Sequence, residues 1–96
     1  MRMMLRTHID AIKGSEALKA GALQKAIGAF IEKFKPEATY FTNDNGMRTG
    51  IFFFDMKDSN LMPVIAEAFF DVGCTVTLQP CMTPEDLHAG LAAEGL

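Results

Sequence analysis

Arg6 and His8 are the two residues of this chain whose types and spacing best suit chemistry on a small molecule. They lie two positions apart in Met3–Asp10, where the residues alternate as in a strand, so their side chains share one face while Leu5 and Ile9 share the other. An imidazole can act as a general base near neutral pH, and a guanidinium can hold a carboxylate or an enolate-like oxygen. The pattern therefore predicts that His8 moves a proton while Arg6 holds an oxyanion.

A polar set in the segment Cys74–Gln79 offers partners for this pair. Thr75, Thr77 and Gln79 alternate with apolar residues, so they lie on one face of the strand that this segment predicts. If that strand neighbours the one at Met3–Asp10, its polar face lines the same concave surface as the cation and the imidazole. We expect the Thr77 hydroxyl and the Gln79 amide to contact a bound molecule.

A structural role is the alternative for these polar side chains. Arg6 and His8 can end in solvent near a strand terminus, or pair with Asp10 or Asp55 across an interface between two copies.

Asp55 follows a run of aromatic residues, and a carboxylate beside such rings can have a raised pKa and serve as a base. More often, an Asp in this position marks the end of a strand.

The unbroken apolar run Ile51–Phe54 must be covered on two sides. Successive strand residues point to opposite faces, so one face of this run packs on helices while the other meets a second sheet, a ligand or a partner. Burying each ring contributes about 2–3 kcal/mol. Either Phe52 or Phe53 is expected to line a pocket with Tyr40 at its rim, and the alternation alone does not assign the two rings to their faces.

Periodicity and turn residues give the expected elements. The expected strands are 3–10, 38–42, 47–56 and 74–79, and the expected helices are 16–35, about 61–72 and about 84–94. Ser15 is the expected N-cap of the first helix, and Pro36 ends it. Asn45 and Gly46 suit a type I′ hairpin turn. That turn would place Tyr40 opposite Ile51 and Phe41 opposite Gly50.

The C-terminal helix is expected to cover a second apolar ridge on the helix before it. Thr83 is its expected N-cap, with a proline after it and Asp86 placed to complete a capping box. Leu87 and Leu91 are then expected to pack on the ridge, which includes Met62 and Phe70.

The order strand–helix–strand–strand–helix–strand predicts a split βαβ, or ferredoxin-like, α+β fold. Right-handed crossovers place both helices on one face of a four-stranded antiparallel sheet, with the strands at 3–10 and 47–56 in its centre. The sequence has no linker, low-complexity segment or fixed-period repeat, so residues 1–96 are expected to form one domain.

In its order of elements, its 96 residues and its two-faced apolar strand "IFFF", the chain resembles the dimeric α+β barrel superfamily. Members of that superfamily include small monooxygenases of antibiotic biosynthesis, muconolactone isomerase-like enzymes and stress-responsive barrel proteins. The resemblance implies a homodimer in which two open sheets pair face to face, with a pocket within the barrel or between each sheet and its helices. It rests on the pattern of elements and transfers no catalytic residue.

Composition and charge argue against a nucleic acid or a membrane as partner. The net charge is −3 and the Lys and Arg residues are scattered, whereas nucleic-acid binders usually carry a basic patch. "RTGIFFF" faintly resembles the β3 motif of RNA-recognition domains, but the first strand lacks their aromatic platform residue. No segment has the length of a membrane span or the pattern of a signal peptide, so a cytoplasmic protein is expected.

Metal and cofactor sites are not expected either. Cys74, Cys81 and His88 are spaced by seven and seven, which matches no common zinc pattern, and glycine-rich phosphate loops are absent. Along an extended strand the two cysteines would lie roughly 20 Å apart, whereas a disulfide requires Cα atoms within about 7 Å. They are expected to be free thiols, as in a reducing compartment.

These features predict a homodimer that binds a small apolar or aromatic molecule. A cofactor-independent reaction on that molecule, of a monooxygenase, isomerase or cyclase type, is one extension of this hypothesis, and whether the chain is an enzyme is left open. The main alternative is a non-catalytic oligomerisation or accessory module whose Phe run serves only the dimer core. An RNA-binding domain is a weaker alternative.

Overall fold

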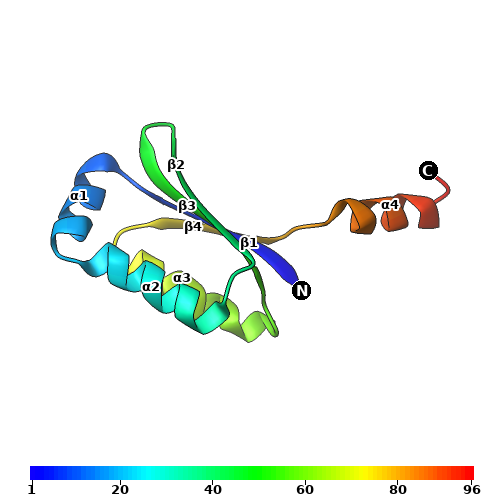
Figure 1. Ribbon diagram of the computed structural model, residues 1–96, viewed down its shortest axis with the longest axis horizontal. Coiled ribbons are helices and arrows are strands. Elements are labelled where there is room, and N and C mark those ends of the chain that lie inside the picture. The colour runs from blue at the N-terminus through cyan, green and yellow to red at the C-terminus, as the bar shows by residue number, and fades with distance from the viewer.

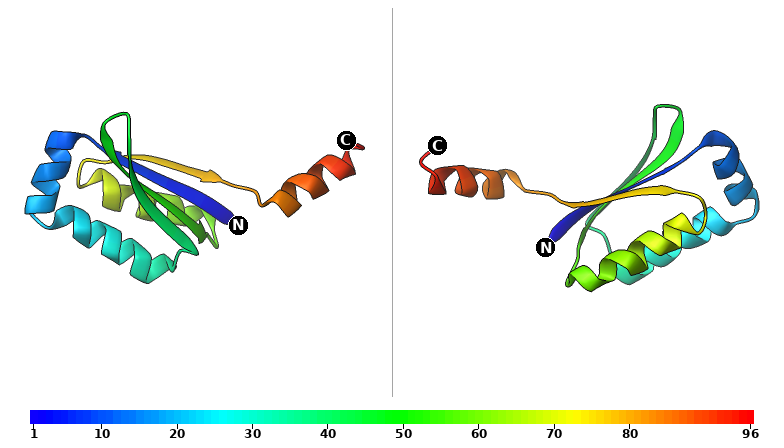
Figure 2. Two further views of the ribbon diagram at one scale, coloured as in Figure 1. Left: turned by 45° about the horizontal axis from the view of Figure 1, so that its top comes forward. Right: turned by 180° about the vertical axis from the view of Figure 1, so that it is seen from behind.

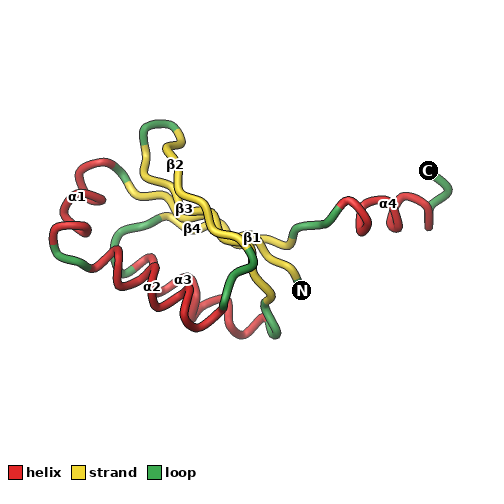
Figure 3. Tube along the Cα trace, in the orientation of Figure 1, coloured by secondary structure: helices red, strands yellow, loops and turns green.

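The computed structural model describes residues 1–96 as a sheet with helices on one side and a further helix projecting from one end (Figures 1 and 3). The strands are β1 (Arg2–Ile9), β2 (Ala38–Asp44), β3 (Met47–Asp55) and β4 (Thr75–Pro80). The helices are α1 (Ala11–Lys19), α2 (Ala22–Phe34), α3 (Met62–Phe70) and α4 (Pro84–Ala93), with a 3-10 turn, η1 (Ser59–Leu61), before α3. None of the helices combines the length and the apolar character that crossing a membrane requires.

The sheet has four strands in the order β2-β3-β1-β4, and every neighbouring pair is antiparallel. This α+β arrangement is consistent with the predicted ferredoxin-like fold. Helices α2 and α3 lie side by side over one face of the sheet, which Figure 2 shows from two directions. The opposite face, called the open face below, carries no helix.

The first helical region begins earlier than predicted. The expected N-cap was Ser15, but the N-cap is Asp10, whose carboxylate accepts a hydrogen bond from the backbone N–H of Lys13 at 2.8 Å. That bond satisfies one of the free N–H groups at a helix start, so α1 begins directly after β1. Gly14 precedes Ser15 and is a poor helix former, but it is buried within α1, so the helix extends through it.

The single helix expected over 16–35 is two helices. The break is at Gly21, whose φ of +75° is left-handed, a conformation that costs other residues about 1–2 kcal/mol. After it, α2 runs to Phe34 and stops before Pro36, as predicted. Because of this break, α1 turns away from the direction of α2 near one end of the sheet (Figure 1).

The predicted hairpin between β2 and β3 is confirmed. Asn45 and Gly46 have φ of 53° and 76°, the positive values that a type I′ turn requires. The register places Tyr40 opposite Ile51 and Phe41 opposite Gly50.

The core assigns the faces of β3, which the sequence left open. Phe52 and Phe54 are 0% and 1% exposed and lie under the helices. Their rings are 5.0 and 5.1 Å from the ring of Phe30 on α2, in edge-on contacts that contribute about 0.5–1.5 kcal/mol each beyond the area they bury. Ile51 and Phe53 therefore point to the open face.

Helix α3 packs through fewer residues than its apolar stripe suggests. Ile65 and Phe69 are buried, but their apolar neighbours Val64 and Ala68 are exposed. These two residues border a shallow groove between α2 and α3.

Helix α4 forms as predicted but does not pack as predicted. The Thr83 hydroxyl accepts from the Asp86 backbone N–H at 3.1 Å and the Asp86 carboxylate accepts from the Thr83 N–H at 3.0 Å, which completes the capping box. The expectation that Leu87 and Leu91 cover the ridge on α3 is wrong. No residue of α4 is buried, and Figure 2 shows the helix projecting away from the rest of the molecule in both views.

Candidate functional site

The open face brings together the polar residues that the sequence singled out. In the sheet register, Arg6 lies opposite Thr77, and His8 lies opposite Thr75. Paired residues of antiparallel strands share a face. The predicted neighbourhood of β1 and β4 is therefore present, with Gln79 opposite Met4 at its other end.

His8 has a partner, Asp44, that the sequence pattern does not indicate. Its Nε2 lies 3.2 Å from Oδ2 of Asp44, at the end of β2, and its side chain is only 14% exposed. The expected partners have other roles, since Asp10 caps α1 and Asp55 pairs with Lys57. A carboxylate that holds one imidazole nitrogen orients the ring and leaves the other nitrogen for a reacting group.

Asp55 does not have the raised pKa that its aromatic neighbours suggested. A hydrogen bond from Lys57 and a second from the Met1 amine lower the pKa of Asp55 from 3.8 to about 2. A carboxylate that is ionised throughout the neutral range is a weak base, so Asp55 is an ion-pair residue at the end of β3.

Arg6 carries a buried donor without a partner. Its Nε is shielded from solvent and makes no hydrogen bond, and it is the only buried side-chain nitrogen or oxygen atom of the chain in this condition. Leaving such a donor unpaired costs about 1–3 kcal/mol, more for a charged group. The open face is therefore electrostatically incomplete in a single chain.

The expected aromatic lining of the open face consists of two side chains. Tyr40 is 63% exposed and lies opposite Ile51, and Phe53 is half-buried opposite Met4. Phe52, the other candidate, is a core residue under the helices and does not reach this face.

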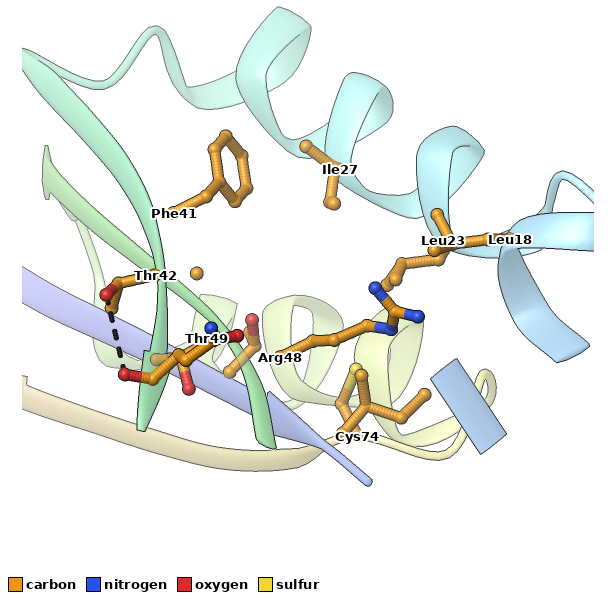
Figure 4. Close-up of a pocket in the computed structure, with 12 residues that line it drawn as sticks. Leu18, Leu23, Ile27, Phe41, Thr42, Arg48, Thr49 and Cys74 are labelled. Atoms are coloured by element: carbon orange, nitrogen blue, oxygen red, sulfur yellow. Dashed lines mark hydrogen bonds between the residues drawn. The ribbon is translucent and has the colours of Figure 1, made fainter. Parts of the chain in front are cut away.

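A cleft lies on the other side of the sheet, where no site was predicted. Its volume is about 470 Å³, and it opens between the β2–β3 hairpin and the bend that joins α1 to α2. Figure 4 shows its apolar walls, formed by Leu18 of α1, Leu23 and Ile27 of α2, and Phe41 of β2. The remaining lining residues are Thr7, Ile9, Thr42, Asn43, Arg48, Thr49, Gly50 and Cys74.

Arg48 is the charged group of this cleft. Its side chain extends from β3 along the cleft toward Leu18 and Leu23 (Figure 4). Nη2 donates to the Ser15 hydroxyl at 3.0 Å, and none of the ion pairs in the molecule includes Arg48. A guanidinium has five N–H donors, so most of them are free to bind an oxyanion.

Two glycines make room for this arrangement. A Cβ on Gly14 of α1 would lie 2.7 Å from Cδ of Arg48, so only a glycine lets the arginine lie flat against the helix. A Cβ on Gly50 would lie 3.1 Å from the Thr7 hydroxyl and 3.3 Å from the Phe41 ring. Gly50 therefore keeps open the space between the sheet and the Phe41 ring.

Cys74 borders the cleft from the position directly before β4 and is 6% exposed. Burial raises the pKa of this thiol above its ordinary value. The thiolate is the reactive form, so Cys74 is a protonated, slowly reacting thiol at neutral pH rather than a nucleophile.

The rate of alkylation should differ between the two free cysteines. At pH 8, iodoacetamide is expected to modify the half-buried Cys81 at least about tenfold faster than Cys74, because Cys74 is both covered and protonated. Mass spectrometry of peptides after timed quenching measures both rates. In urea the two rates should converge, and equal rates in the folded protein would contradict the buried position of Cys74.

No cluster of three or more His, Cys, Asp or Glu side chains is placed to hold a metal ion. The chain therefore has two candidate sites for a small molecule. One is the His8–Asp44 pair with Arg6 on the open face, and the other is the cleft with Arg48 on the helix side. Neither a scan against protein-family models nor a search of curated protein sequences finds a match for this chain.

Proposed function

We propose that this chain binds a small organic anion with a flat apolar body in the cleft beside Arg48. The observation that carries the proposal is a guanidinium without an acidic partner that borders a cleft with an apolar wall. A volume of about 470 Å³ lies within the range of roughly 300–1,000 Å³ that small-molecule sites occupy. Apolar walls with one convergent charged group are the usual composition of such sites.

The Phe41 ring and the aliphatic side chains that face it favour a planar aromatic or unsaturated body. Phe41, on β2, offers a ring at the cleft that is 59% exposed and free to pack on a ligand. Ile27 and Leu23 face it from α2 (Figure 4). A flat group between these walls would place a carboxylate near the guanidinium of Arg48, where two parallel N–H···O bonds can form.

The proposed assembly is a homodimer formed through the open face, which is the face that also forms the interface in the dimeric α+β barrel arrangement. Ile51 and Phe53 leave apolar surface on the two-faced strand β3, and the unpaired Nε of Arg6 lies on the same face. A second copy would cover the apolar surface and bring an acceptor to the Arg6 guanidinium. The two free thiols fit a reducing compartment, and we place the protein in the cytoplasm.

A second candidate function is proton transfer at the open face. The hydrogen bond between His8 and Asp44 favours it, because it orients the imidazole beside Arg6, which could hold an oxyanion. This would make the protein a cofactor-independent enzyme. If His8→Ala leaves both binding and turnover of an identified ligand unchanged, this candidate falls and a non-catalytic binding module remains.

Binding of naphthalene-2-carboxylate, compared with naphthalene-2-carboxamide, tests the proposal. The two probes share an apolar body, and only the first carries the charge that Arg48 would bind. Hydrogen bonds to charged groups contribute about 1.5–3 kcal/mol, so the carboxylate should bind about tenfold tighter or more. Amide shifts in ¹⁵N–¹H NMR spectra should centre on Thr7, Phe41 and Gly50.

Equal affinities, or shifts confined to the open-face residues, would contradict the proposed site. Absence of binding by both probes at millimolar concentration would favour the alternative of a purely structural or oligomerisation module.

A further inference from the structure

Helix α4 and the segment that leads to it hold all the excess negative charge of the chain. Residues 81–96 contain Glu85, Asp86 and Glu94 and no Lys or Arg, whereas residues 1–80 contain nine residues of each sign. The arm, defined as residues 81–96, thus differs in charge from the neutral body that it leaves.

The root of the arm is fixed to the body while the rest extends away. The backbone N–H of Cys81 donates to the carbonyl of Arg2 at 3.2 Å. Hydrogen bonds from Thr83, with a smaller effect of the Arg2 charge, lower the pKa of Asp86. The first turn of α4 therefore lies near Arg2, and the following turns point into solvent, as Figure 1 shows.

A helix in this position needs a surface to pack on. Isolated helices shorter than about 12–15 residues are marginal in water, and α4 has ten residues with Gly90 in its interior. The capping box supports only its first turn. Leu87 and Leu91 are 48% and 42% exposed, so no part of the same chain supplies the missing burial.

One side of α4 combines apolar and acidic groups. Leu87 and Leu91 are four residues apart and share one side of the helix, and Glu94, its C-cap residue, follows Leu91 by three positions at the end of that side. A complementary surface must offer apolar side chains next to a cation that lacks a partner.

The open face has that composition. Ile51 lies directly opposite Arg6 in the register, with Phe53 two residues further along β3. The buried Nε of Arg6 has no hydrogen-bond partner. Helix α4 does not reach the open face of its own chain, because the hydrogen bond at Arg2 fixes the start of the arm in a position from which α4 points away from the sheet.

We propose that α4 of one copy packs on the open face of a second copy, with Glu94 paired to Arg6 of that copy and the two leucines on Ile51 and Phe53. The pairing is reciprocal in a two-fold dimer, so each arm covers the other chain. This inference rests on the proposed homodimer and refines it, because Ile51 and Phe53 would be covered by the partner's arm and not directly by its sheet.

Charge reversal tests the pairing. Glu94→Arg is expected to raise the dimer dissociation constant about tenfold or more, measured by light scattering across a dilution series, and Arg6→Glu is expected to do the same. The double variant, with both changes, should return to within about threefold of the wild type. Glu67→Arg, on the exposed side of α3, makes the same change in net charge and should leave the constant unchanged.

Mixed dimers show which chain the arm contacts. One copy carries Cys74→Ser, Cys81→Ser and Gly90→Cys with a nitroxide on the new thiol, and the other copy is ¹⁵N-labelled without a nitroxide. Loss of the amide signals of Arg6, Ile51 and Thr77 in the second copy is the expected result.

The possible failures are distinguishable. A dimer that is insensitive to Glu94→Arg and shows no signal loss in mixed samples would overturn the role of the arm and keep the proposed dimer. A wild-type chain that is monomeric at millimolar concentration would overturn both. Neither result would affect the proposed ligand site in the cleft, which lies on the other side of the sheet.

Discussion

Phe52→Ala is expected to lower the free energy of unfolding by about 3–5 kcal/mol, whereas Phe53→Ala, one residue away, should cost about 1 kcal/mol or less within one chain. The Phe52 ring is 0% exposed and contacts Phe30 and Phe69, at ring distances of 5.0 and 6.1 Å. Its removal leaves a cavity that the packed helices above it cannot fill. Domains of this size are stable by about 5–15 kcal/mol, so the loss is a large share of the total.

Urea unfolding followed by circular dichroism, at two protein concentrations, measures both effects. Phe53 lies on the open face, so its removal should weaken the dimer and its cost should grow with protein concentration. The cost of Phe52→Ala should be nearly independent of concentration. Similar losses for both variants in a monomeric background would mean that β3 does not hold the register in which Phe52 faces the helices.

The order of the strands and the regions that form helices could be predicted, although the first helical region is two helices and not one. Alternation, turn residues and prolines marked the strands, and Asn45-Gly46 fixed the hairpin register. The faces of β3 could not be predicted, because a strand that is apolar on both sides has no internal signal of which side meets the helices. Only the packing of Phe30 against Phe52 and Phe54 decides it.

Two weaker sequence signals point to the cleft. Arg48 has the same strand parity as Phe52 and Phe54, so a charged side chain had to point toward the helices. Gly50, an isolated glycine within a strand, is typical of a close approach of other groups. The bend at Gly21 that completes the cleft gave no comparable signal. Gly21 and Gly28 both lie within the predicted helix 16–35, and the sequence does not show that only Gly21 adopts a positive φ.

The partner of His8 was missed for a similar reason. Asp44 belongs to a segment rich in turn residues, so a turn was expected to account for it. The strand β2 continues to Asp44, and its side chain meets His8 across β3. An Asp can serve either a local turn or a tertiary contact, and the sequence pattern alone favours the turn.

Arg48→Gln is expected to weaken the binding of naphthalene-2-carboxylate by about 10- to 100-fold while leaving the affinity for the carboxamide nearly unchanged. The substitution removes the charge and the fork of donors but keeps a polar side chain that can still contact Ser15. Isothermal titration calorimetry or NMR titration measures both affinities. Lys25→Gln, on the exposed side of α2, removes the same charge away from the cleft and should change neither.

Gly14→Ala tests the same site without touching the charge. The new Cβ would lie 2.7 Å from Cδ and 2.8 Å from Nε of Arg48, so the arginine must move away from Ser15. We expect about tenfold weaker binding of the carboxylate with little loss of stability, because alanine favours a helix over glycine by about 1 kcal/mol. Gly28→Ala is the matched control, since a Cβ there meets nothing within 4 Å. It should bind the probe like the wild type. If Gly14→Ala also binds normally while Arg48→Gln does not, the charge of Arg48 matters but the position that α1 imposes on it does not.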